Sequence, residues 1–253
     1  MSRQIALLAI EGLPLVAPGD DIARLLIAAL ERMRESLHDG DIVVVTQKIV
    51  SKAEDRYRDL AQVTPSARAI ALAERTGKDA RLVELILAES RAVIRARPGV
   101  LIVEHRLGFI HANGGIDQSN VGNAEHVLLL PADPDGTAAR LRDELSAHYR
   151  ARIAVIINDS SGRAWRNGVI GFAIGCAGIA PLVDLVGTPD LFGRRLQNTE
   201  VAVADELAAA ASVLMGQAGE ALPAVVIRGA DCLPGSDGAR ALLRDPALDL
   251  FRD

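Results

Sequence analysis

The stretch AVIRARPGVLIVEH, residues 92–105, decides the fold class. It contains two apolar, β-branched runs, Ala92–Arg95 and Val100–His105, separated by ArgProGly at 97–99. Such runs around Pro and Gly are typical of strands joined by a hairpin or another tight return. Two more strand-like runs, 109–111 and 127–130, follow without a helical pattern between them. This strand-rich middle third predicts an α+β fold with mixed or antiparallel sheets and helices, rather than a doubly wound parallel sheet.

Further strands and helices flank this stretch. Apolar runs predict strands at 4–10, 42–46, 153–158 and 224–228. A helical apolar period from Ile22 to Leu37 predicts a helix capped by Asp20 and Asp21 and ended by AspGly at 39–40. Other helical patterns cover 80–90, 137–149, 200–215 and 238–243. Because no repeat or loose linker divides residues 1–253, we expect a single module of two closely packed, interleaved subdomains, whose boundary the sequence does not show.

The composition excludes several classes of protein. The 253 residues are 49% hydrophobic, 24% charged and 3% aromatic, with a formal net charge of -5. The apolar fraction excludes a disordered chain, and two cysteines exclude a disulfide scaffold and fit a reducing compartment. The acidic balance and the few aromatic rings argue against nucleic-acid binding. The N-terminus lacks the long apolar region of a signal peptide. We therefore expect a soluble, cytoplasmic protein.

The longest uncharged run, residues 168–183, is rich in glycine. It is too short to cross a bilayer, which takes about 20 apolar residues. Its glycines at 168, 171, 175 and 178 have the spacing of one helix face. We interpret the run as a buried segment whose glycines let another backbone come close.

Two polar clusters follow strand-like runs. The run 153–158 leads into AspSerSerGlyArg at 159–163, and a carboxylate with hydroxyls at a strand end suits a hard cation and its phosphate oxygens. The same residue types also form ordinary turns. The run 109–112 leads into AsnGlyGlyIleAspGlnSerAsn at 113–120, which offers one carboxylate, several amides and two glycines. A plain hairpin loop explains this second cluster equally well.

Two other clusters carry lysines and glycines. After the run 42–46, Lys48 and Lys52 would share one helix face, suited either to an oligophosphate or to solvent. The predicted helix 200–215 ends in GlyGlnAlaGlyGlu at 216–220, which is also a common helix stop. The sequence contains no P-loop, GxGxxG, HExxH, CxxC or GxSxG pattern. Together, the four clusters indicate metal-assisted phosphate chemistry.

Segments along almost the whole chain, from Ile5 to Gly229, resemble the coenzyme F420:glutamate ligase family. They occur in order as EGLPLV at 11–16, GDD at 19–21, GDIVVVT at 40–46, SKAE at 51–54, GIDQSNV at 115–121, LLPADPDG at 129–136, NDSSGR at 158–163, GVIGFAIG at 168–175, ADE at 204–206, LMG at 214–216 and PAVVIRG at 223–229. No single segment is as distinctive as a P-loop, but so many in order make chance an implausible explanation.

The resemblance implies a GTP-dependent ligase. Such an enzyme joins L-glutamate through a γ-linked amide bond to the carboxylate of a deazaflavin cofactor precursor, coenzyme F420-0, by way of an acyl phosphate, and releases GDP and phosphate. The family also implies two divalent ions (Mg²⁺ or Mn²⁺), K⁺ and a homodimer, with no nucleic-acid or membrane partner. This chemistry needs positioning and charge neutralisation rather than a protein nucleophile. We therefore expect no catalytic side chain beyond the metal and phosphate ligands.

The family's functional positions can be carried over residue by residue. The metal ligands fall on Asp117, Asp159, Ser160 and Gln217. The nucleotide positions fall on Leu13, Pro14, Leu15, Val16, Gln47, Lys48, Lys52, Asn120, Met215, Gly216, Gln217, Ala218, Gly219, Glu220, Ala221 and Leu222. These positions coincide with the polar clusters, apart from the segment 13–16.

The sequence departs from the family pattern at three places. AsnAspSer at 158–160 replaces a common Thr-Asp-Thr, Gln217 stands where an acidic ligand can occur, and Asp55 replaces a usual glycine. Ser160 keeps the hydroxyl, whereas a neutral Gln217 leaves more positive charge on a metal. Two alternatives therefore stay open: a catalytically inactive nucleotide- or deazaflavin-binding homologue, and a ligase for another carboxylate acceptor. We also expect the standalone form, without the C-terminal reductase domain that some relatives carry.

Overall fold

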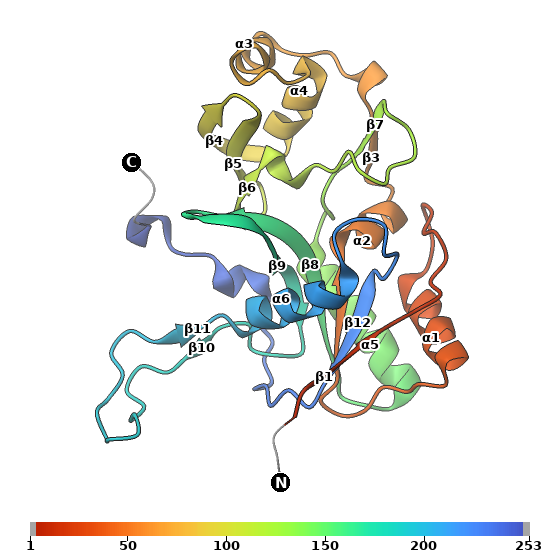
Figure 1. The fold of residues 1–253 in the computed structure, drawn as a ribbon, viewed down its shortest axis with the longest axis vertical. Coiled ribbons are helices and arrows are strands. Elements are labelled where there is room, and N and C mark those ends of the chain that lie inside the picture. The colour runs from red at the N-terminus through yellow and green to blue at the C-terminus, as the bar shows by residue number, and fades with distance from the viewer. Residues whose placement is uncertain (1–3, 250–253) are drawn as a thin grey trace. The chain divides into compact units, whose positions relative to one another are not determined.

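The fold is that of a computed structural model, which describes residues 4–249 (Figure 1). The chain divides into two compact units, each assembled from three separate stretches of sequence. Among the described residues, unit 1 contains 4–50, 133–160 and 170–242, and unit 2 contains 51–132, 161–169 and 243–249. The predicted α+β class is confirmed, because helices accompany several mixed and antiparallel sheets.

Unit 1 is built on a five-stranded sheet in the order β1-β12-β2-β8-β9. In that order the strands are Ala6–Ala9, Ala224–Arg228, Ile42–Thr46, Ala154–Arg163 and Arg166–Ala177. Strand β12 is antiparallel to both β1 and β2, whereas β2 and β8 are parallel, so the sheet is mixed. Its central strands are almost continuously apolar because both faces of the sheet are covered.

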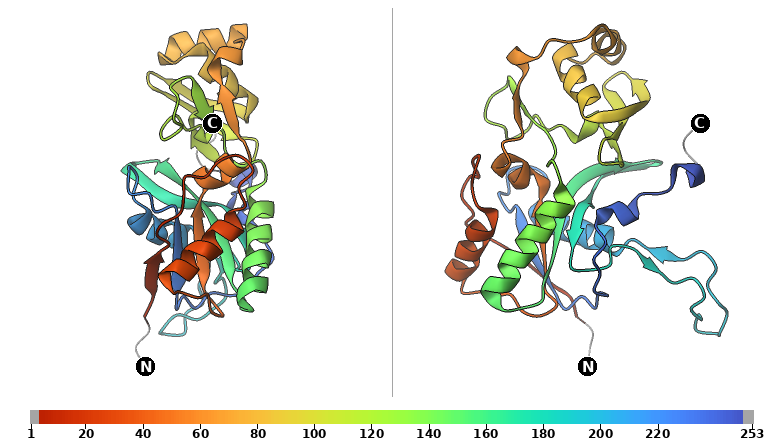
Figure 2. Two further views of the ribbon diagram at one scale, coloured as in Figure 1. Left: turned by 90° about the vertical axis from the view of Figure 1, so that its right-hand side faces the viewer. Right: turned by 180° about the vertical axis from the view of Figure 1, so that it is seen from behind.

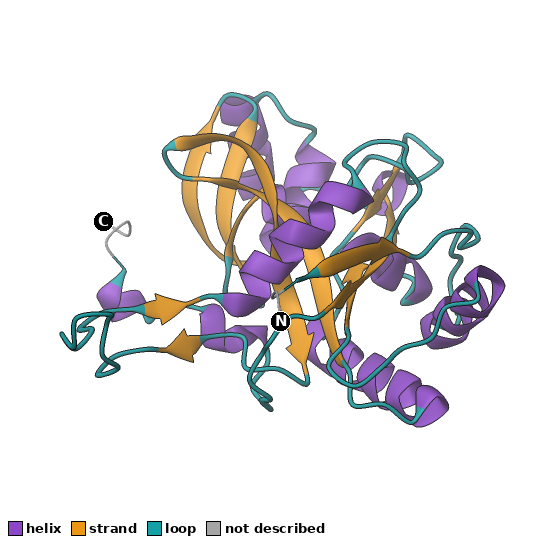
Figure 3. Cartoon of the chain, turned by 60° about the horizontal axis from the view of Figure 1, so that its bottom comes forward, coloured by secondary structure: helices purple, strands orange, loops and turns teal. Residues whose placement is uncertain are grey.

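Helices cover both faces of this sheet. Helix α6 (Val203–Met215) packs in one core cluster with Val44 of β2 and Ile156 of β8. Helices α1 (Ile22–Met33) and α5 (Pro134–Tyr149) contact each other and lie on the opposite face (Figure 2). Two short strands of unit 1, β10 (Val183–Asp184) and β11 (Glu200–Val201), form the base of a narrow arm (Figure 3).

Unit 2 combines two helices with two small sheets. Helices α3 (Ala67–Thr76) and α4 (Ala80–Ala88) pack on β4 (Ser90–Arg97) and β5 (Val100–His105) around a smaller apolar cluster. Strand β6 (Ile110–Ala112) pairs with β5, and β3 (Tyr57–Asp59) pairs with β7 (His126–Leu128). Helix α2 (Gln47–Ala53) begins in unit 1 and ends in unit 2. Short 3-10 turns lie at Leu60–Gln62, Asn113–Gly115, Ala239–Leu242 and Pro246–Leu248.

The predicted hairpin in residues 92–105 is confirmed. Strands β4 and β5 pair in antiparallel fashion, with Arg97 opposite Val100. Gly99 has a φ of +83°, a conformation that glycine adopts without steric cost. Strands β2, β5 and β12 have the predicted bounds, and the structure contains each of the other predicted strands with shifted ends.

Four predicted helix bounds are wrong: α5 begins at Pro134 instead of 137, α4 ends at Ala88 instead of 90, and two other errors have identifiable reasons. The first helix ends at Met33 because Arg34 turns to a φ of +59° and its N–H bonds the carbonyls of Leu30 and Glu31. Leu37 lies beyond this end but is only 2% exposed, so it extended the apolar period without being helical. The helix predicted from residue 200 begins at Val203, since 200–201 form β11. The sequence patterns also did not identify α3.

The glycines of the run have helical spacing, but residues 166–177 form a strand, β9. The predicted burial is wrong for the start of the run, where Val169 is 54% exposed, but the predicted close approach is confirmed at Gly171 and Gly175. A Cβ atom added to Gly171 would lie 2.5 Å from the carbonyl oxygen of Ala208, and one on Gly175 would overlap the backbone of Pro134. The predicted helix at 238–243 is only the 3-10 turn Ala239–Leu242. Among residues 4–249 we find no helix long and apolar enough to span a bilayer.

Candidate functional site

The strand directions bring four of the predicted segments to one edge of the sheet in unit 1. Strands β1, β2 and β8 run in the same direction, since β1 and β2 both oppose β12 and β8 parallels β2. Their carboxyl ends therefore meet at one edge, together with the amino end of β12. In open α/β sheets, ligands bind outside the carboxyl ends of the parallel strands, and β2 and β8 are such a parallel pair here. We call this the carboxyl edge; the segments there are 11–16, 47–48, 158–160 and 215–223.

Backbone hydrogen bonds fix these segments to one another. The N–H of Ile10 bonds the carbonyl of Ala224 at 2.9 Å, and the N–H of Thr46 bonds the carbonyl of Pro223 at 2.8 Å. Thr46 also lies opposite Asn158 in the β2–β8 register. Main-chain pairing therefore brings these segments together. Helix α2 begins at Gln47, directly after the last residue of β2, so no loop separates the two elements.

The segment after β1 presents apolar side chains at the carboxyl edge. Val16 is buried, while Leu15 is 93% exposed. The guanidinium of Arg32 in α1 donates to the carbonyl of Gly12 at 2.8 Å and holds the segment against that helix. Leu15 is therefore an exposed apolar contact on an anchored loop, which suits a planar ring of a ligand better than a phosphate.

The start of α2 supplies the amide and the charge at this edge. Gln47 is 2% exposed, whereas Lys48 is partly buried. Residues 47–53 are helical, so Lys48 and Lys52 share one face as predicted. Lys48 belongs to unit 1 and Lys52 to unit 2.

The AspSerSerGlyArg cluster is not a turn. Strand β8 continues to Arg163, because residues 159–163 pair with β9 instead of leaving the sheet. The carboxylate of Asp159 accepts a hydrogen bond from the N–H of Ser160 at 2.8 Å. Alternation along the strand directs Ser160 to the side of Ile156 and α6, and Asp159 to the other side. The two predicted metal ligands therefore leave the strand on opposite faces.

The turn after α6 is well formed. Helix α6 ends at Met215, and Gly216 has a φ of +69°. The Glu220 carboxylate accepts from the N–H of Ala218 at 2.8 Å, and this backbone hydrogen bond is the main reason that the pKa of Glu220 is lowered. Gln217 is exposed. The predicted helix stop is confirmed, and the turn stands beside β2 because Pro223 bonds Thr46.

The other predicted residues belong to unit 2. The main chain of Asp117 pairs with Leu128 through two hydrogen bonds of 2.9 Å, so its side chain leaves a fixed backbone position. Asn120 has a φ of +58°, a left-handed conformation that asparagine tolerates better than most residues. Asp117, Asn120 and Lys52 are thus fixed within unit 2, whereas the remaining predicted residues gather at the carboxyl edge of unit 1.

The donor atoms at the carboxyl edge bear on the predicted metal. Within residues 4–249, no group of three or more His, Cys, Asp or Glu side chains is arranged to hold a metal ion. The predicted ligands contain only two carboxylates, with a hydroxyl and an amide. Oxygen donors of this kind suit Mg²⁺ or Mn²⁺, particularly with waters and phosphate oxygens completing the shell. The metal assignment stays a prediction.

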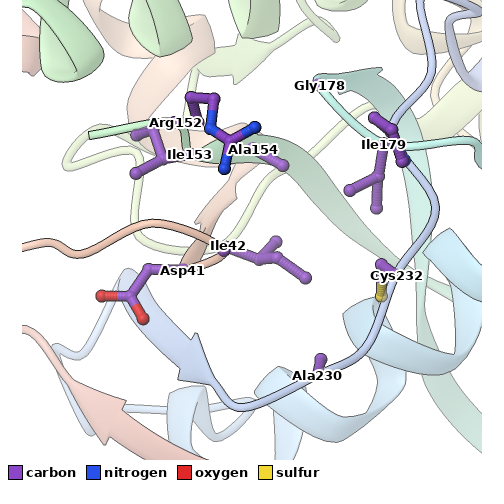
Figure 4. A pocket seen from close by; sticks show the side chains of 11 residues that line it. Asp41, Ile42, Arg152, Ile153, Ala154, Gly178, Ile179, Ala230 and Cys232 are labelled. Atoms are coloured by element: carbon purple, nitrogen blue, oxygen red, sulfur yellow. The ribbon is translucent and has the colours of Figure 1, made fainter.

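A separate pocket of about 270 Å³ lies at the opposite edge of the sheet of unit 1 (Figure 4). It is lined at the amino ends of β2 and β8 by Asp41, Ile42 and Ala154, and across from them by Ile179 and Cys232. None of the predicted nucleotide or metal residues lines it. This cavity therefore does not coincide with the carboxyl edge.

Asn158 is a residue that the sequence reasoning noted only as a departure from a family pattern. It is 5% exposed, and its side-chain amide donates to Ser212 and Met215 of α6. The available signal was a lone amide ending the apolar run AVII in residues 154–157. A polar side chain at that place is buried only with hydrogen-bond partners, which points to a specific local role.

Comparison with known proteins gives one consistent result. The family model described as F420-0:Gamma-glutamyl ligase matches residues 12–229. A coenzyme F420:L-glutamate ligase from Methanothermobacter thermautotrophicus is 50% identical over 98% of this chain and 99% of its own length. Relatives with the same name from Methanopyrus kandleri and Archaeoglobus fulgidus are 44% and 42% identical, over 97% and 96% of this chain and 98% and 94% of their own.

Proposed function

The chain belongs to the F420-0:gamma-glutamyl ligase family, and we propose that it is a coenzyme F420:L-glutamate ligase driven by GTP. The observation that carries this proposal is the end-to-end relation to ligases of that name, at up to 50% identity. The carboxyl edge supports it, because three segments that the resemblance assigns to the nucleotide, 13–16, 47–48 and 215–222, converge there through main-chain pairing, whereas Lys52 and Asn120 belong to unit 2.

The proposed reaction has two steps. The carboxylate of the deazaflavin precursor attacks the γ-phosphorus of GTP, which forms an acyl phosphate and releases GDP. The amine of L-glutamate then attacks the acyl carbon, loses a proton and expels phosphate, so that an amide bond forms. Both steps need close, aligned reactants and compensated negative charge, and neither needs a protein nucleophile.

Residues of the chain can supply these needs. Lys48 and Lys52 offer two positive charges on one helix face for the triphosphate, which the net charge of -5 otherwise repels. The turn 215–222 and the segment 13–16 offer backbone and apolar contacts for the nucleoside.

A divalent ion, Mg²⁺ or Mn²⁺, would neutralise phosphate charge when bound. The residues fit it in chemistry, since Asp159, Ser160, Gln217 and Asp117 present only oxygen-bearing groups. The Oδ1 atom of Asp159 already accepts a backbone hydrogen bond, which fixes the orientation of the carboxylate. We propose Asp159, Ser160 and Gln217 in unit 1, and Asp117 in unit 2, as metal ligands. Since the side chains of Asp159 and Ser160 leave β8 on opposite faces, they would serve two different divalent ions, and K⁺ is a further proposed requirement for activity.

The test is a glutamyl-transfer assay. The protein is mixed with GTP, Mg²⁺, L-glutamate and the precursor F420-0, and the product is examined by mass spectrometry. We expect a mass gain of one glutamyl unit or more, with one GDP and one phosphate per bond. Parallel reactions contain ATP or another carboxylate acceptor. Nucleotide binding without any product would contradict the proposal and favour an inactive binding homologue, while product only with another acceptor would redirect it.

The family also implies a homodimer, for which the arm of unit 1 offers a contact surface. The loop between β10 and β11 carries Leu191 and Phe192, which are 98% and 95% exposed, with Val186 half exposed. Large exposed apolar side chains are typical of contacts with another chain. We propose that the arms join two copies. Light scattering of the protein should give a dimer, and a double substitution Leu191→Ser and Phe192→Ser should give a monomer; a wild-type monomer would contradict this.

A further inference from the structure

Asn158 connects the carboxyl edge to helix α6 by side-chain hydrogen bonds. Its amide nitrogen lies 3.1 Å from the hydroxyl oxygen of Ser212 and 3.4 Å from the sulfur of Met215. Ser212 in turn donates to the carbonyl of Ala208 at 3.0 Å. Because that donation uses the single hydroxyl proton and the thioether can only accept, the nitrogen of Asn158 must face α6.

The orientation leaves the amide oxygen against strand β9. This oxygen has no hydrogen-bond partner within residues 4–249, although Asn158 is only 5% exposed. A Cβ atom added to Gly171 would lie 2.7 Å from it, so the absence of a side chain there provides the space. A buried acceptor without a partner destabilises the fold. The two hydrogen bonds from Asn158 to α6 must offset the cost of burying its amide oxygen. The contact between Asn158 and α6 is therefore a specific polar interaction rather than general packing.

The position of this contact relates it to the turn 215–222. Met215 is the last residue of α6 and the first of the turn. The other end of the turn is held by the hydrogen bond from Thr46 to Pro223. Thr46 and Asn158 lie opposite each other in the β2–β8 register. Both ends of the turn are thus attached to one rung of the sheet, next to Asp159.

We propose that Asn158 is a positioning residue that fixes the nucleotide-binding turn 215–222 relative to the strand carrying Asp159 and Ser160. The proposal rests on the proposed function, since the nucleotide role of the turn comes from there. Asn158 acts through Met215 and Ser212 and does not itself contact the substrate. The two protons of the Asn158 amide allow it to donate to both partners at once.

Two readouts test the proposal in the full-length protein. Asn158→Ala should increase the hydrogen-exchange rate of backbone amides in residues 216–220 about tenfold, as expected for the loss of two neutral hydrogen bonds. The same variant should weaken binding of GTP with Mg²⁺ about tenfold, and raise KM for GTP more than it lowers kcat. Val213→Ala is the matched control: Val213 lies on α6 beside Ser212 but is 79% exposed, so both readouts should stay at wild-type values.

Ser212→Ala keeps the test valid if Asn158→Ala does not fold. It removes one acceptor and should give about threefold faster exchange in the turn, because one of two hydrogen bonds remains. Where both variants fold, their double mutant should resemble Asn158→Ala alone. Unchanged exchange in 216–220, or an equal increase throughout β2 and α6, would overturn the positioning role.

Failure of the proposed function gives a different pattern. If wild-type protein does not bind GTP but Asn158→Ala still accelerates exchange in 216–220 selectively, the attachment of the turn is correct and its nucleotide is wrong. If wild-type protein binds GTP and the variant binds equally well with normal exchange, Asn158 does not position the turn.

Discussion

Each of the two units is stabilised internally by a different kind of interaction. In unit 1, the central strands are apolar and fully covered: Val44, Ile156 and Val225 have no exposed surface. In unit 2, a smaller apolar cluster is accompanied by a partly buried ion network around Glu89. In unit 1, strand register fixes the positions of the predicted site segments. In unit 2, ion pairs of Glu89 help to fix the positions of the loops.

The Glu89 network is compact. Its carboxylate lies 2.9 Å from both Arg56 and Arg106 and 3.7 Å from the ring of His105, which is fully buried. Arg56 also donates to the carbonyl of Leu130 at 2.8 Å. Burial raises the pKa of Glu89, but the nearby ring of His105, the hydrogen bond from Arg106 and the charges of both arginines outweigh burial and lower it to about 2. The network therefore joins four distant stretches of unit 2 through one carboxylate.

The largest expected effect is on activity at the carboxyl edge. Asp159→Asn keeps the shape of the side chain but removes its charge, so we expect at least a thousandfold loss of GTP turnover, or about 4 kcal/mol of transition-state stabilisation. The melting temperature should change little, because the strand is fixed by main-chain pairing. Near-normal turnover would contradict the metal assignment of Asp159.

The next effect concerns the apolar core of unit 1. Ile156→Ala removes a side chain without exposed surface from the contact between β8 and α6. We expect the free energy of unfolding to fall by about 3–4 kcal/mol. Denaturant unfolding measures this value. A loss below about 1 kcal/mol would mean that the core of unit 1 is not the main source of its stability.

Glu89→Gln tests the ion network of unit 2. It keeps the volume but leaves two arginines without their carboxylate, and the side chain of Arg56 is only 15% exposed. We expect a loss of about 2–3 kcal/mol, with faster hydrogen exchange in β5 than in β2. Arg152→Ala, which removes an exposed ion pair with Asp39, is the control and should leave the free energy of unfolding nearly unchanged. Equal effects of the two variants would contradict the contrast between the units.

Low pH should destabilise unit 2 more than unit 1. The folded pKa of Glu89 is lowered from 4.5 to about 2, so its stabilisation is present above pH 4.5 and is lost as the pH falls toward 2. Burial lowers the pKa of His105, which adds a loss that begins as the pH falls below 6.5. In unit 1, burial raises the pKa of Asp205, so protonation favours the folded state there. Hydrogen exchange, corrected for intrinsic rates, should show β5 losing protection before β2; the reverse order would contradict this.

The smallest effect concerns Asp55, which has a φ of +52° in the turn after α2. Glycine adopts this conformation at no steric cost. Asp55→Gly should therefore stabilise the protein by about 0.5 kcal/mol and raise Tm by about 1–2 °C. Asp55→Ala, which keeps the strain and loses the tolerance of Asp for it, should lower Tm. If Asp55→Gly and Asp55→Ala shifted Tm in the same direction, the backbone conformation of Asp55 would not be strained.

The sequence predicted best where burial alone determines structure. Strands β2, β5 and β12 have the predicted bounds, because continuous β-branched runs have few alternatives to a covered strand. The end of β8 was wrong because Asp, Ser and Gly favour turns locally, whereas pairing with β9 keeps residues 159–163 extended. Similarly, the glycines of β9 are spaced for a helix but serve close contacts with α6 and α5.

The candidate site was predicted as separate segments rather than as an arrangement. The segments 13–16, 47–48, 159–160 and 215–222 were identified in sequence, but their convergence depends on Ala9 pairing with Val225 and Thr46 with Asn158. Such long-range pairings leave no local signal. The role of Asn158 was hidden for the same reason, since its partners on α6 are 54 and 57 residues away.

The most direct test of the carboxyl edge as the nucleotide site is a hydrogen-exchange footprint of GTP with Mg²⁺ on the full-length protein. We expect slower exchange in residues 11–16, 47–52 and 215–222, and no change at the pocket formed by Ile42, Ala154 and Cys232 at the opposite edge. Protection confined to that pocket, or catalytic turnover without protection of 215–222, would contradict the placement of the nucleotide.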